Sequence, residues 1–304
     1  MVINMVEDIG KIISNGFGTY SKNLNISIPF ILNFFITIVM AAIVAGFGFF
    51  YIFAPSLSSI ENAGSPEAVA SILLPLFSQH IIEIIMLVVI IFFLVFSIQA
   101  YFISGAIGMA IQATGSGKSH LLDMREAGRK NFINMFLAEI LFSLISLAGV
   151  VFIVPGAMRI DISRILTSEN TGGVALLMGG IFMWVIYLLI LSILLAVFRY
   201  ALVAENLGPI ESMTASLDFF KKNKIDVILL FVIVIVLGVA FFIVDQVMGL
   251  IPVINILWSF ISLIISAIII PPITTIWWVR IYMDRTNKKY ISMSFLPTRT
   301  TLRK

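Results

Sequence analysis

Six long apolar runs constrain this chain more than any other feature of its sequence. Each is at least as long as the roughly 20 residues that a helix needs to cross a bilayer. Backbone groups cannot stay unpaired in hydrocarbon, so runs of this kind must be helical. The sequence therefore predicts an all-α integral membrane protein with six transmembrane helices, at residues 26–53, 80–112, 132–156, 174–203, 226–247 and 254–283.

Composition agrees with this prediction. Only 12% of the 304 residues are charged and 60% are hydrophobic, whereas about 25% of residues are charged in an average soluble domain. Cysteine is absent, which excludes disulfides and thiolate metal sites. We expect a single membrane domain over residues 1–304, with a cytoplasmic amphipathic segment (1–22), a six-helix bundle (26–283) and a basic cytoplasmic tail (284–304).

The distribution of basic residues predicts the orientation. All of the 19 Lys and Arg residues except Arg159 and Arg164 lie in segments on the side that holds both termini. Cytoplasmic loops carry such an excess of basic residues, so both termini are expected in the cytoplasm. On the outer side we expect short helices beginning at Ser65-Pro66 and within residues 158–166.

A short motif ending in Lys-Asn precedes the first, third and fifth spans, at Lys22-Asn23, Lys130-Asn131 and Lys222-Asn223. Apolar residues at helical spacing lead into each motif. This pattern predicts three hairpins that point the same way, each preceded by a cytoplasmic amphipathic helix, and related as parallel repeats. Ordinary interfacial anchoring by Lys-Asn is the alternative.

Two stretches resemble a known group. Glu211-Ser212-Met213-Thr214-Ala215-Ser216 runs into the third motif, and Pro271-Pro272-Ile273-Thr274-Thr275 continues to Tyr282 and Arg285. Both are similar to segments of uncharacterised six-helix proteins grouped with the glycerophosphodiester-phosphodiesterase membrane-domain superfamily. The resemblance implies a membrane-embedded helical domain. The phosphodiesterase chemistry of that superfamily belongs to a separate soluble domain, so the resemblance implies no activity here.

Motifs for catalysis or cofactors are not found. Residues 115–119 (Gly-Ser-Gly-Lys-Ser) look like a phosphate-binding loop, but Gln112 stands where that loop needs a small residue, and a transmembrane span precedes it. His80 and His120 lie at opposite ends of one span, so they cannot share a metal ion. We therefore expect no cofactor, metal or nucleic acid, and the sequence favours an enzyme least.

Charged residues inside the spans give the best functional hypothesis, because such residues are costly in lipid and usually face a bundle interior or a cavity. We expect Glu139 to pair with Arg199 or Arg280, although both arginines could instead reach the interface with their long side chains. Pro271 and Pro272 should kink the last span and free backbone carbonyls. The predicted ligand-binding residues are Glu139, Arg199, Arg280, Pro271 and Pro272.

Two classes of function follow. The first is a permease or carrier that binds a lipid or a small molecule, which the hairpin bundle and the buried Glu139 favour. The second is a non-catalytic scaffold or assembly subunit of a membrane complex. The expected partners are the lipid bilayer and either a second copy of the chain or another membrane protein.

Overall fold

The computed structural model describes residues 7–159 and 171–287. Most of these residues are helical, and none of them lies in a strand. The predicted number of spans is confirmed, because six helical segments are long and apolar enough to cross a membrane, and the chain is a multi-pass membrane protein. The six segments are Leu24–Glu61, Ile81–Ser116, Leu121–Phe152, Gly172–Glu205, Lys224–Gly249 and Asn255–Arg285.

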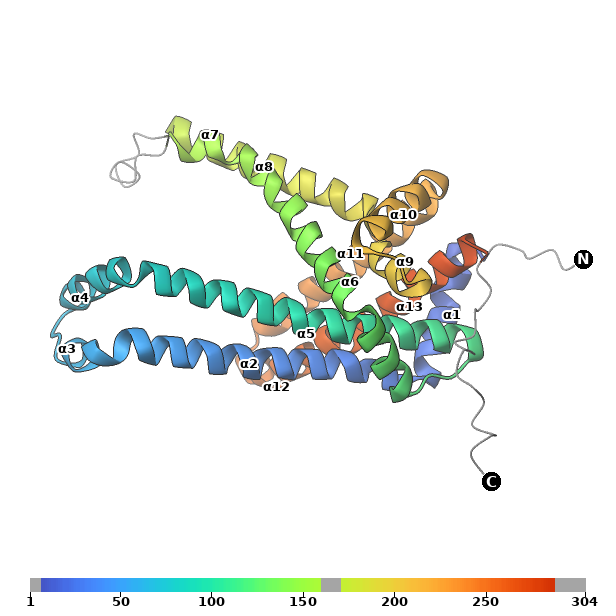
Figure 1. Cartoon of the computed structure of the whole chain (residues 1–304), viewed down its shortest axis with the longest axis horizontal. Helices are drawn as coiled ribbons and strands as arrows, with labels where there is room; N and C mark the ends of the chain where they lie inside the picture. The colour runs from blue at the N-terminus through green and yellow to red at the C-terminus, as the bar shows by residue number, and fades with distance from the viewer. Residues whose placement is uncertain (1–6, 160–170, 288–304) are drawn as a thin grey trace, which may run out of the picture.

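The long helices form three hairpins, which we call the arms, and the arms diverge from one packed end of the molecule (Figure 1). The short helices α3 (Leu57–Glu61) and α4 (Pro66–Gln79) lie at the tip of the first arm, and α7 (Val154–Ala157) at the tip of the second. The arm helices are α2 (Ile28–Phe53) with α5 (Ile81–Ser116), α6 (Leu121–Ala148) with α8 (Thr171–Leu194), and α11 (Lys224–Gly249) with α12 (Pro252–Ile264).

We call the packed end the base. It consists of the end of α5, the beginning of α6, the beginning of α11 and four shorter helices. The described chain begins and ends in the base (Figure 1). The shorter helices are α1 (Ile9–Lys22), α9 (Phe198–Glu205), α10 (Pro209–Lys222) and α13 (Ile270–Arg285).

Burial divides the helices at the boundary between base and arms. The buried residues of α5 all lie between Ala100 and Ala113, and those of α6 between Ala127 and Glu139. The stripe of small residues Ala100, Ser104 and Gly108 is completely buried or nearly so. A Cβ added to Gly108 would come within 2.2 Å of Ala127 Cβ. Small residues therefore allow α5 and α6 to approach closely.

Several boundaries differ from the prediction. Residues 121–127 form the first turns of α6 and not a separate helix, since no breaker follows the N-cap at His120, whose backbone N–H donates to Asp123 Oδ2 over 2.7 Å. The fourth span breaks at residues 195–197 into α8 and α9. Ser216 Oγ stabilises this break by donating to Leu194 O and accepting from Val197 N.

A helix begins at Pro66 as predicted, namely α4, with Ser65 Oγ accepting from Ala68 N at 3.2 Å, while its location on the outer side stays a prediction. Residues 160–166 of the second predicted external helix lie outside the described residues. The sixth span is interrupted near the predicted place: a π-helical turn, Ile265–Ile269, precedes α13, and Pro271 lies in the first turn of α13. A first-turn proline costs little, because its missing N–H would have no partner within the helix.

Candidate functional site

The predicted ion pair between Glu139 and Arg199 is present where the arms meet the base. Arg199 Nε donates to Glu139 Oε1 at 2.5 Å, and Arg199 Nη2 donates to Glu139 Oε2 at 2.9 Å. The Glu139 side chain is 5% exposed and that of Arg199 is 36% exposed. Bidentate pairs of this kind are strong and fix both side chains. The pair therefore joins α6 to α9.

The break between α8 and α9 gives Arg199 its position. Arg199 is the second residue of α9, and its guanidinium carbon lies 5.3 Å from the ring centroid of Phe198. Phe198 in turn stacks on Phe142 of α6, with ring centroids 5.5 Å apart. Apolar contacts thus hold the same two helices beside the ion pair. Whether Glu139 and Arg199 bind a ligand stays a prediction.

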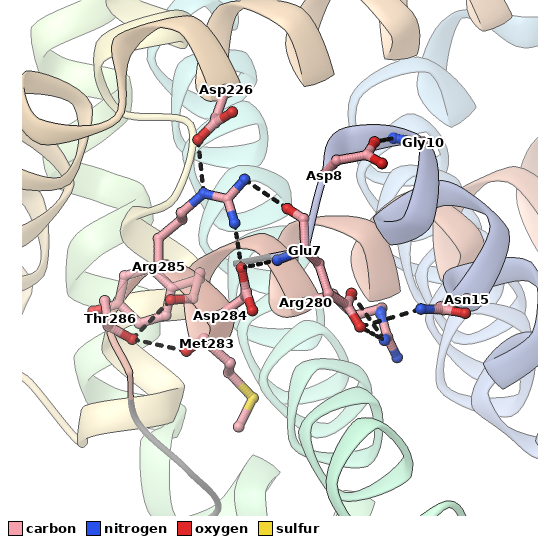
Figure 2. A network of polar contacts seen from close by, with 11 residues as sticks. Glu7, Asp8, Gly10, Asn15, Asp226, Arg280, Met283, Asp284, Arg285 and Thr286 are labelled. Carbon is pink, nitrogen blue, oxygen red and sulfur yellow. Dashed lines mark hydrogen bonds and ion pairs between the residues drawn. The ribbon is translucent and has the colours of Figure 1, made fainter. Parts of the chain in front are cut away.

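Arg280 takes a different partner. Its Nη2 donates to both carboxylate oxygens of Glu7, at 2.9 and 3.1 Å, and its Nη1 donates to Thr19 Oγ1 at 3.3 Å. Asn15 Nδ2 also donates to Glu7 Oε1, over 3.1 Å. Figure 2 shows the side chains of Glu7, Asn15 and Arg280 pointing toward one another. The pairing of Glu139 with Arg280, which the sequence left open beside the pairing with Arg199, is not found.

Arg285 extends this network to the fifth span. Its Nε donates to Asp226 Oδ2 at 2.7 Å, its Nη2 donates to the backbone carbonyl of Glu7 at 2.8 Å, and its Nη1 contacts Asp284 (Figure 2). Glu7 N donates to Asp284 Oδ2 at 3.1 Å. The network therefore connects the beginning of α1, the beginning of α11 and the end of α13. The sequence analysis did not identify Glu7 or Asp226, although Asp226 is the first residue of the predicted fifth span and Glu7 lies in the predicted amphipathic segment.

Two pockets open on the base. The first lies between α5 and α6, has a volume of about 450 Å³, and is lined by Ser97, Ile98, Tyr101, Phe102, Arg129 and Phe132. We call it the Arg129 groove. The second, of about 410 Å³, lies between α1, the end of α5 and α13, and includes Arg280. Pro272 is buried at the start of α13 and Pro271 is half-buried beside it, and neither lines these two pockets.

A third pocket, of about 450 Å³, lies at the tip of the third arm. Polar side chains of α11 and α12 line it, among them Asp245, Asn255 and Ser262. Trp258 Nε1 donates to Asp245 Oδ1 at 2.9 Å and so closes this hairpin.

Residues 115–119 do not form a phosphate-binding loop. α5 continues through Ser116, and Gly117 ends it with a left-handed φ of 80°. A helix C-terminus presents carbonyl groups, whereas a phosphate-binding loop needs the N–H groups of a helix N-terminus. His80 Nδ1 lies 3.6 Å from Glu83 Oε1, and no group of three potential metal ligands occurs within the described residues.

Residues 68–282 match the family described as Domain of unknown function (DUF7847). The chain belongs to this family. The matched range of the DUF7847 domain extends from α4 to α13 and contains Arg129, Glu139, Arg199 and Arg280, whereas Glu7 and α1 precede it. No curated protein and no solved structure matches the chain. The family description names no activity.

Proposed function

We propose that this DUF7847 protein is a membrane carrier that binds an anionic amphipathic molecule of the lipid class. The observation that carries the proposal is the Arg129 groove, which combines an apolar wall with one cationic side chain. Ile98, Phe102 and Phe132 form the apolar part. Binding sites for small molecules typically pair such walls with few polar groups that fix the orientation of the ligand.

Arg129 is suited to bind an anionic headgroup. It is exposed, and within the described residues it has no acidic partner. Guanidinium groups bind phosphates and carboxylates with two parallel hydrogen bonds. The Tyr101 hydroxyl and the Ser97 hydroxyl add polar atoms to the same groove. A ligand with one anionic group and an acyl chain matches this combination of charge and apolar surface.

The proposal includes the finer architecture, namely three parallel hairpin repeats with both termini in the cytoplasm and with α1 and α10 as cytoplasmic amphipathic helices. The asparagine of each Lys-Asn motif supports the repeat. Asn23, Asn131 and Asn223 all donate their side-chain amide to the carbonyl four residues earlier, over 3.0, 3.0 and 3.1 Å. Interfacial anchoring alone would not require the same hydrogen bond at the three corresponding positions, whereas a repeat would.

Each hairpin also has contacts of its own between its two helices, which supports three separate repeat units. A Cβ on Gly48 of α2 would lie 2.5 Å from Leu87 of α5. In the second arm Trp184 Nε1 donates to Ser146 O at 3.2 Å, and Trp258 makes the corresponding contact in the third.

We retain the resemblance to the glycerophosphodiester-phosphodiesterase membrane-domain superfamily as part of the proposal. Its two stretches lie in α10 and α13, where Ser212, Met213 and Ser216 and then Pro272, Ile273 and Thr275 are buried in the base. Proteins that share a fold are expected to be similar at buried positions such as these.

Native mass spectrometry of gently extracted protein tests the carrier. We expect an added mass of lipid size on the wild-type chain and on Arg125→Gln, and its loss on Arg129→Gln. Arg125 is the matched control because it is exposed, lies one turn earlier on α6 and does not line the groove. Equal lipid retention by all three proteins would contradict the proposal.

A scaffold role is the second candidate, and the arms favour it. Large apolar side chains of the first arm are widely exposed, among them Phe47 (75%), Tyr51 (72%) and Leu74 (69%). Such faces can contact another membrane protein as well as lipid. In the same experiment, a stoichiometric protein partner without a bound lipid would favour the scaffold.

A further inference from the structure

A polar pocket of about 410 Å³ lies in the base where α1, the end of α5 and α13 meet. It lies apart from the Arg129 groove and shares no lining residue with it. The side chains that matter here are Ser14, Asn15, Thr19, Lys22, Thr114 and Arg280.

This lining is rich in hydrogen-bond donors and carries positive charge. Lys22 and Arg280 contribute two cationic groups, and Asn15 contributes an amide. Hydroxyl groups of serine and threonine can donate or accept, so they adapt to an anion. No acidic side chain lines the pocket within the described residues. The nearest carboxylate in the network, Glu7, is already bound by Arg280 and Asn15.

Arg280 supplies a second observation. Its Nη groups are bonded to Glu7 and Thr19, but its Nε is buried and has no acceptor. Buried donors are normally satisfied, and leaving one unsatisfied is costly. An anion in the pocket would add acceptors near the Arg280 guanidinium. Lys22 lines the same pocket, is exposed, and has no ion-pair partner within the described residues.

We propose that this pocket binds a phosphate-like anion and that the bound anion stabilises the docking of α1 on α13. The chemistry is shared by a free phosphate and by the phosphate headgroup of a lipid. The link to α1 follows from the geometry, because four of the six polar lining residues belong to α1 and Arg280 belongs to α13. This proposal is independent of the carrier function, since it concerns a different pocket.

The test uses the full chain in nanodiscs of phosphatidylcholine alone, titrated with inorganic phosphate by calorimetry. A second arm uses nanodiscs that contain phosphatidic acid without free phosphate. Hydrogen exchange of the α1 amides is measured in both. The variants are Lys22→Gln and Arg280→Lys, and the control is Lys11→Gln, an exposed lysine of α1 outside the pocket.

We expect phosphate to bind to the wild-type chain and to Lys11→Gln, to slow exchange in α1, and to bind at least about tenfold more weakly to Lys22→Gln, the usual effect of losing one charge-assisted hydrogen bond. Arg280→Lys should keep the fold and weaken binding as well. Slowed exchange in phosphatidic acid alone, with the same dependence on Lys22, would support the pocket with a lipid headgroup as its ligand. An equal loss in Lys11→Gln, or no effect of either phosphate source, would overturn the proposal.

Discussion

The base and the arms of this protein hold together in different ways. In the base, Ala100, Met135 and Ile276 are fully buried and two ion-pair networks connect the helices. In the arms, α5 has no buried residue before Ala100, and α11 has none after Leu230. The three arms are therefore joined to each other through the base.

The solvent explains the difference. Lipid is as apolar as leucine, so the arms gain little by burying apolar side chains against each other. Their own contacts include glycine-mediated approach, single hydrogen bonds and, at the tip of the first arm, a small apolar cluster of Ile52, Phe53 and Leu76. The base packs like the interior of a soluble domain, in which volume changes and unpaired charges are costly. Mutations with the same chemistry should therefore have larger effects in the base than in the arms.

The largest effect is expected from the ion pair at the boundary. Glu139→Gln leaves the Arg199 guanidinium without its carboxylate, and losing one partner of a buried pair costs about 3–5 kcal/mol. Because Arg199 is partly exposed, we expect the lower end of this range. Thermal unfolding in detergent measures the loss. Glu126→Gln, an exposed carboxylate on the same helix, should be neutral, and equal effects of both variants would contradict the comparison.

Glycine substitutions compare base and arm directly. Gly108→Ala places a Cβ 2.2 Å from Ala127 Cβ, whereas a Cβ on Gly46 of α2 meets nothing within 4 Å. Overpacking costs about 1–3 kcal/mol, so Gly108→Ala should lower the unfolding temperature and Gly46→Ala should not. Similar unfolding temperatures for the two variants would show that the base can expand at no cost.

The repeated asparagines have a smaller, graded effect. Asn131→Ala removes a buried amide that is bonded to Ala127 O, and a typical hydrogen bond contributes about 1 kcal/mol. Asn23→Ala should cost more, because Asn23 also donates to Gly117 O and accepts from Ser119 N, linking α1 to the segment after α5. Thermal unfolding of both variants against an exposed control, Lys11→Ala, measures the order. The opposite order would mean that the link from Asn23 to the segment after α5 contributes little to stability.

The smallest effect is expected within an arm. Trp184→Phe removes the hydrogen bond to Ser146 O and keeps most of the apolar volume. Hydrogen bonds between helices in membranes average about 0.6 kcal/mol. The unfolding temperature should therefore stay close to that of the wild-type chain. A loss as large as that of Glu139→Gln would mean that the second arm is coupled to the base more tightly than its burial indicates.

The sequence predicted the features that depend on local pattern. Apolar length placed all six spans, and the cost of charge in lipid identified Glu139 as a paired residue with Arg199 or Arg280 as its partner, of which the structure has Arg199. The sequence did not predict features that depend on contacts between segments far apart in the chain. Glu7 and Arg280 are 273 positions apart, and no periodicity relates them. The break before α9 contains neither glycine nor proline, and its stabilising group, Ser216, comes from another helix.

The network of Figure 2 also bears on how the chain is made. Glu7 precedes its partners Asp284 and Arg285 by 277 and 278 positions in the chain. Synthesis proceeds from the N-terminus, and units fold as they emerge. Each arm can thus enter the membrane and close as it is made, whereas Glu7 can meet its partners only after α13 has been translated. The network of Figure 2 therefore forms after the three arms, and truncation before α13 would leave the arms without it.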